Sequence, residues 1–176
     1  DPEKRCQALA DGRLHLETSV AAYKRQMARG RLFLHEHPKG AKSFDEECMK
    51  ELQATEGVYT VHGPMCNWDL APLDSKRKGS EPQAFCKKET TWVTNSKRLA
   101  ERLQGVCSNV DGSRPWHRHL HLVGGLGHFA RIYTPKLVTA ILEEAKAEIL
   151  DMCELSDLEL RDSGPCLLYT SPSPRD

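Results

Sequence analysis

The sequence predicts an α/β fold with an incomplete, mostly parallel, Rossmann-like sheet and flanking helices. Amphipathic helical patterns alternate with short apolar runs through the first third of the chain, as expected for a parallel sheet. Two of these runs, residues 31–36 and 58–63, follow a glycine and have the length of strands. The 176 residues fit one domain of ordinary size, without an internal repeat or an interdomain linker.

The first helix is predicted over residues 6–29. Its apolar residues recur at spacings of three, four or seven, so they share one face. These residues are Leu9, Leu16, Val20, Tyr23 and Met27. Gly30 follows as a C-terminal cap. The run "RLFLHE" after it is predicted to be a central strand, because it is apolar without interruption between two helices.

A second helix is predicted over residues 43–55. Ser43 is suited to the N-cap, and Glu46 stands three residues later in the capping-box position. The next strand is "VYTVHG", residues 58–63. This order of helix, strand, helix and strand is the alternation from which a parallel sheet is predicted.

The second half of the chain contains one further strand and two further helices. "TTWVT", residues 90–94, is β-branched and aromatic and predicts a strand. A helix that Asn95 or Ser96 can cap follows it. The last helix is predicted over residues 134–155, with Thr134 as its cap and a proline in the first helical position.

Composition limits the function classes that the sequence allows. Lysine plus arginine and aspartate plus glutamate both number 25, so no excess of positive charge indicates nucleic acid. No apolar run approaches the length of a membrane span, so no membrane partner is expected. The seven cysteines form no CxxC pair and favour reduced thiols, as in an intracellular protein.

The two ends of the chain differ in character from the rest of the sequence. The N-terminus has no initiator methionine and no secretory apolar segment, so we expect residues 1–162 to be a partial domain that begins inside a longer reading frame. Residues 163–176 are rich in serine and proline and predict a disordered tail. The stretch "CLLYTSPSPRD" at 166–176 resembles the translation of a sequencing adaptor and is left out of the functional interpretation.

A candidate catalytic site follows the strand at 31–36, where His35, Glu36 and His37 precede Pro38. Ligands of open α/β sheets bind beyond the carboxyl ends of the strands, so this strand end is suited to carry reactive groups. Alternation along a regular strand places His35 and His37 on the face opposite Glu36. The alternative is a strand that simply ends in a polar loop.

Four blocks of sequence together resemble a domain of copia-type retroelement polyproteins from dinoflagellates and other algae. They are "QMARGRLFLHEHP", "MCNWDL", "TTWVTNSKRLAERLQGVC" and "HRHLHLVGG" with the later "ARIYTPKLVTAI". The resemblance covers residues 13–142, and the order of the blocks carries more weight than any one of them. The chain departs from the family at Lys88-Glu89-Thr90, where family members have Lys-Pro-Thr.

That family domain is similar to the catalytic core of cytosine-5 DNA methyltransferases. The resemblance implies that Glu36 is the carboxylate that faces a flipped base, with His35 and His37 beside it. S-adenosylmethionine would bind only in a longer domain, because this chain lacks the glycine-rich turn and the Pro-Cys nucleophile of those enzymes. Cys66 follows a predicted strand and is the best placed of the cysteines considered as an alternative nucleophile.

A second constellation predicts a metal site. His117, His119 and His121 alternate, so they share one face of a strand. Two imidazoles and two thiolates make a tetrahedral zinc set. We therefore predict zinc ligands at Cys66, Cys107, His119 and His121, and we choose the last two histidines because the family-like H-x-H pair is there. The alternative is a solvated strand face, with Cys107 as a small core hydrophobe.

Three functions stay open at this level. The first is an accessory segment of a retroelement polyprotein with a methyltransferase-like fold, not catalytic by itself. The second is a zinc-stabilised module that binds nucleic acid or the rest of its own polyprotein. The third is a structural domain without chemistry. Lysines and arginine at 76–78 and 87–88 can contact a phosphate backbone or be merely solvated.

Overall fold

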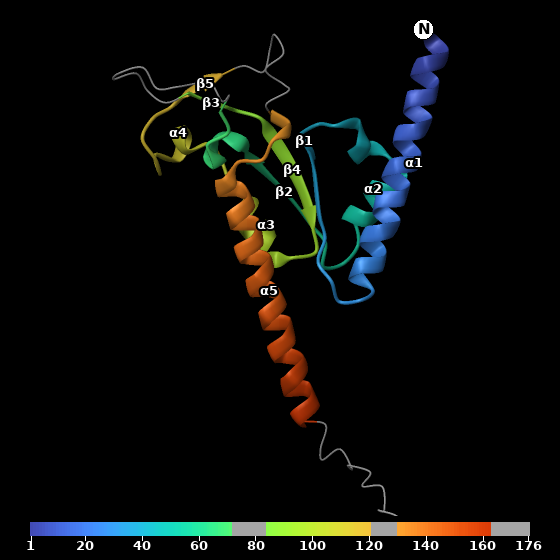
Figure 1. The fold of residues 1–176 in the computed structure, drawn as a ribbon, viewed down its shortest axis with the longest axis vertical. Coiled ribbons are helices and arrows are strands. Elements are labelled where there is room, and N and C mark those ends of the chain that lie inside the picture. The colour runs from blue at the N-terminus through green and yellow to red at the C-terminus, as the bar shows by residue number, and fades with distance from the viewer. Residues whose placement is uncertain (72–83, 121–129, 163–176) are drawn as a thin grey trace, which may run out of the picture.

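The computed structural model describes residues 1–71, 84–120 and 130–162, with the backbone alone from residue 154 onward (Figure 1). The helices are α1 (Pro2–Met27), α2 (Glu47–Gln53), α3 (Lys97–Leu103), α4 (Ser108–Asp111) and α5 (Pro135–Asp162). The strands are β1 (Leu34–Pro38), β2 (Tyr59–Pro64), β3 (Ala84–Cys86), β4 (Glu89–Thr94) and β5 (Arg118–Leu120). The 3-10 turns η1 and η2 span Lys42–Asp45 and Met65–Trp68. The tail predicted at 163–176 lies outside the described residues.

Three strands form an antiparallel sheet in the order β1-β4-β2, and β3 pairs in parallel with β5. The α/β class is therefore confirmed, whereas the prediction of a mostly parallel sheet is wrong for the described strands. β1 and β2 run in the same direction, as the helix between them implies. They are not neighbours, because β4 lies between them and pairs with each in the antiparallel sense.

The strand predicted at residues 31–36 is an edge strand of this sheet and not a central one. Its ladder begins only at residue 34, because side chains bind the backbone before that point. Thr94 Oγ1 donates to the Phe33 carbonyl at 2.6 Å, and Asn95 Nδ2 donates to the Arg31 carbonyl at 3.0 Å. The central strand is β4, in which all residues after the first are buried.

Helices cover both faces of the three-stranded sheet, with α1 and α2 on one side and α3 and α5 on the other (Figure 1). On the α1 side, Val93 of β4 packs with Phe33 and with apolar residues of the two helices. Those helix residues are Leu16, Val20, Met49 and Leu52. On the α5 side, Trp92 packs with a larger set, which includes Met65, Leu99, Leu103, Leu137 and Ala140. Alternation along β4 thus sends its side chains into two cores.

Helix α1 is longer than predicted, and only its second half is packed. Leu16 and Val20 are buried as predicted, whereas Leu9 is 67% exposed. Figure 1 shows the N-terminal half of α1 extending away from the sheet. The helix ends at Met27, and Gly30 adopts a positive φ of 62°, in agreement with its predicted role at this end.

Two of the predicted helix caps are confirmed, and one is wrong. The Ser96 side chain caps α3, and Thr134 Oγ1 accepts a hydrogen bond from the backbone at the start of α5. Ser43 does not cap α2, because it lies inside η1 and contacts His37 instead. Glu46 is itself at the N-cap of α2, without a side-chain capping bond.

Candidate metal centre

Four side chains from separate elements converge near the parallel pair of strands. Cys66 lies in η2, directly after β2, and Cys107 lies just before α4. His117 precedes β5, and His119 is the middle residue of that strand, opposite Phe85 of β3. Cys66, Cys107 and His117 are each at most 3% exposed, so the cluster lies in the interior.

The four ligand atoms all lie within 4.8 Å of one another. The two Sγ atoms are 3.7 Å apart, and Cys107 Sγ lies 3.7 Å from His117 Nε2 and 3.3 Å from His119 Nε2. The two Nε2 atoms are 3.0 Å apart. Zinc bonds of about 2.3 Å to sulfur and about 2.0–2.1 Å to nitrogen put tetrahedral ligand atoms about 3.3–3.8 Å apart. The cluster is therefore close to the spacing of a Cys2His2 metal centre.

Two asparagine side chains hold the segments that carry these ligands. Asn67 Nδ2 donates to the Val106 carbonyl at 2.7 Å, and its Oδ1 accepts from the Ser108 backbone at 3.1 Å. Asn67 therefore ties the Cys66 turn to the residues on either side of Cys107. Asn109 binds the backbone of His117 in the same way. Its Nδ2 donates to the His117 carbonyl at 2.7 Å, and its Oδ1 accepts from the His117 backbone N–H at 3.0 Å. Such supporting bonds fix the orientation of the metal ligands that they flank.

Burial and the neighbouring thiol raise the pKa of Cys66 to about 12, so this thiol keeps its proton when no cation is present. Burial, together with the nearby His119 and Arg114, lowers the pKa of His117. A neutral imidazole is the form that binds a metal. A divalent cation at the centre would supply the positive charge that makes the buried thiolates stable.

The structure brings together three of the four residues that the sequence predicted as ligands. Cys66, Cys107 and His119 converge, whereas His121 lies outside the described residues. His117 completes the described set. Sequence alternation had already placed His117 on the same face as His119, but it contains no information about which histidine lies nearest Cys107.

The predicted catalytic residues divide between the two faces of β1. Glu36 lies on the α5 side, where Oε1 accepts from Lys88 Nζ at 3.0 Å and Oε2 accepts from the Tyr133 hydroxyl at 2.9 Å. Its side chain is 17% exposed, so it is not free at the end of an open strand. His35 and His37 lie on the other face, in contact with Tyr23 and Ser43. The catalytic role of the three residues stays a prediction.

The two lysines of the middle region that the structure describes, at 87–88, are each close to a glutamate. Lys88 is paired with Glu36, and Lys87 lies 3.5 Å from Glu89. The run at 76–78 lies outside the described residues. Among the described residues, no helix is both long enough and apolar enough to span a membrane.

Comparison of the chain with protein-family models, with curated proteins and with solved structures finds no match in any of the three.

Proposed function

We propose that this chain is a zinc-stabilised accessory domain of a retroelement polyprotein, in which the metal has a structural role. The observation that carries the proposal is the convergence of Cys66, Cys107, His117 and His119 within 4.8 Å. Two thiolates and two imidazoles are a ligand set that suits zinc better than the hard cations, which prefer oxygen.

A structural role follows from the number of ligands that the protein supplies. Catalytic zinc sites keep one position open for water or substrate, whereas structural sites fill all four positions with side chains. Here four side chains are available, and three of them are at most 3% exposed. The metal would join η2, the start of α4 and β5. Of these, η2 already contributes Met65 and Trp68 to the α5-side core, whereas α4 contributes no residue to either main core and β5 only the partly buried Leu120.

The wider assignment rests on the sequence blocks. Their order supports a retroelement polyprotein as the source of the chain and a methyltransferase-like domain as its larger context. In that context the partner of this domain is the rest of the polyprotein, and nucleic acid is a further candidate. S-adenosylmethionine belongs to the longer domain, and Glu36 is the residue proposed to face the base there. Lys88 and Tyr133 engage both Glu36 oxygens, so this geometry favours the structural proposal over a catalytic one.

Cobalt substitution tests the proposed ligand set. Tetrahedral Co²⁺ bound by two thiolates should give sulfur-to-metal charge-transfer and d–d absorption bands when it is added to metal-free protein, and Zn²⁺ should abolish them. Cys66→Ser should lose most of the charge-transfer intensity, and His117→Ala should change the d–d bands. Cys6→Ser is the matched control, because Cys6 is exposed and lies in α1, which contributes no residue to the cluster. Octahedral cobalt bands in all four proteins would contradict the proposal.

A further inference from the structure

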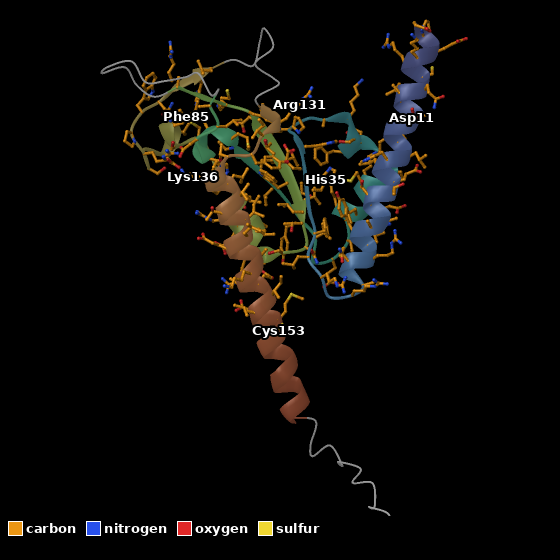
Figure 2. The ribbon with its side chains drawn as sticks, in the orientation of Figure 1. Asp11, His35, Phe85, Arg131, Lys136 and Cys153 are labelled. Atoms are coloured by element: carbon orange, nitrogen blue, oxygen red, sulfur yellow. The ribbon has the colours of Figure 1, made fainter. Side chains whose placement is uncertain are left out.

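A second candidate site lies between α1 and the histidine face of β1, and it shares no residue with the metal centre. A cavity of about 480 Å³ opens there, lined by α1, β1 and the η1 region. Figure 2 shows His35 between β1 and α1, in a different part of the molecule from Phe85 beside the metal centre. Volumes of about 300–1,000 Å³ are typical of small-molecule sites.

His35 is a buried polar residue in the lining of this cavity. Its side chain is 7% exposed, and its Nε2 is buried without a hydrogen-bond partner in the part of the chain that the structure describes. Nδ1 lies 3.2 Å from the Tyr23 hydroxyl. A buried nitrogen without a partner is destabilising, so a bound group that satisfied it would be favoured.

The contact with Tyr23 decides which hydrogen-bonding group the cavity offers. Burial raises the pKa of Tyr23, so its hydroxyl keeps the proton and can donate it to Nδ1. Burial and His37 lower the pKa of His35 to about 4, so the ring is neutral. A neutral ring that accepts at Nδ1 carries its own proton on Nε2. His35 therefore presents a hydrogen-bond donor at Nε2, and a ligand that binds there must carry a hydrogen-bond acceptor.

Apolar residues of α1 line one part of the cavity, and polar and charged side chains of α1, β1 and the η1 region line the rest. Leu9 and Leu16 line the cavity along α1. Arg13 is paired with Glu46 at 3.1 Å, whereas the ammonium of Lys42 has no ion pair among the described residues. The ligand that complements these walls has a hydrocarbon body and a single negative charge.

We propose that this cavity, the His35 cavity, binds a small monocarboxylate with an apolar body, such as a medium-chain fatty acid. Because Nε2 is buried, the His35 ring turns on binding so that Nε2 donates to one carboxylate oxygen. The charge lies toward Lys42, and the chain packs on Leu9 and Leu16. Binding requires no metal ligand, so this proposal stands apart from the zinc assignment.

Calorimetric titration with decanoate below its critical micelle concentration tests the proposal on the whole chain. Wild type should bind decanoate, and decanol should bind about tenfold more weakly or worse, because it lacks the charge and the second oxygen. His35→Gln should weaken decanoate binding by about tenfold. His62→Gln is the matched control, because His62 is an exposed residue on the same face of the sheet and does not line the cavity.

A second variant keeps the test decisive if His35→Gln fails to fold. Gly12 lines the cavity, and a Cβ there would meet nothing within 4 Å, so Gly12→Phe can fill the space without a backbone clash. It should abolish decanoate binding while its circular dichroism and thermal melt match the wild type. Equal affinity for decanoate and decanol, undiminished binding by Gly12→Phe, or no binding by wild type would each overturn the proposal.

Discussion

At the residue scale, Gly63 of β2 is a position where the fold requires the absence of a side chain. A Cβ at this residue would lie 2.3 Å from the backbone carbonyl oxygen of Leu103, at the end of α3. Backbone atoms cannot yield as a flexible side chain does, so the strand and the helix would have to separate. We expect Gly63→Ala to lower the free energy of unfolding by about 3 kcal/mol, as measured by urea denaturation.

Gly12 provides the control for this prediction. It lies inside α1, and a Cβ there would meet nothing within 4 Å. Gly12→Ala should therefore raise stability by up to about 1 kcal/mol, since alanine favours the helix. If Gly63→Ala were as stable as Gly12→Ala, the close approach of β2 to α3 would be contradicted.

His35 predicts a specific dependence of stability on pH. Its pKa in the folded protein is lowered to about 4 from 6.5, mainly by burial. The unfolded chain therefore takes up a proton first as the pH falls below 6.5, and the folded state loses stability down to about pH 4. Urea midpoints measured from pH 7 to pH 4 should fall less steeply for His35→Gln than for wild type.

The matched control for this titration is His15→Gln, because His15 is exposed on α1. Its urea midpoints should follow the wild-type pH dependence, including any part that comes from protonation of the metal ligands. If His35→Gln and His15→Gln gave the same slope, the buried neutral state of His35 would be wrong.

Residue-scale patterns in the sequence were informative where they depend on local geometry. The alternation of "HEHP" correctly separates Glu36 from His35 and His37, because side chains of a strand point to alternate faces. The partners of these residues were not predictable from that pattern. Lys88 and Tyr133 are 52 and 97 residues from Glu36 along the chain, and local periodicity has no information at such distances.

At the element scale, α5 caps another helix with one of its own side chains. Glu148 Oε2 accepts a hydrogen bond from Ser96 Oγ at 3.0 Å and another from the Arg98 backbone at 3.1 Å. A carboxylate at a helix N-terminus satisfies backbone donors and complements the helix dipole. We expect Glu148→Ala to lower the free energy of unfolding by about 1 kcal/mol.

Glu143→Ala is the control for this capping interaction, because Glu143 is exposed on the same helix. It should change the free energy of unfolding by less than about 0.5 kcal/mol. Equal effects of the two substitutions in chemical denaturation would show that α5 does not cap α3.

The elements themselves followed from the sequence more readily than their pairing. The strands at 58–63 and 90–94 and the caps at Ser96 and Thr134 agree with the structure, because these features depend on neighbouring residues. The antiparallel order did not follow, since β4 enters between β1 and β2 from a distant part of the chain. The alternation of helices and strands predicts the relative direction of successive strands, but it does not predict which strands are neighbours in the sheet.

At the scale of the whole molecule, the candidate metal centre brings together residues from a long stretch of chain. Cys66 and Cys107 are 41 residues apart, and the histidines follow Cys107 by 10 and 12 residues. This spacing is unlike that of a zinc finger, so the sequence could suggest the residue types but not the final set. His117 belongs to the described ligand set because it directly precedes β5, which lies beside β3, whereas His121 lies outside the described residues.

Metal analysis of the purified protein tests the zinc assignment most directly, with His117→Ala, His119→Ala and His15→Ala measured beside the wild type. His15 is the control, because it is an exposed histidine outside the cluster. The account predicts about one zinc per chain in the wild type and in His15→Ala, and a large loss in the other two variants. Near-zero zinc in all four proteins, or equal zinc in all four, would contradict it.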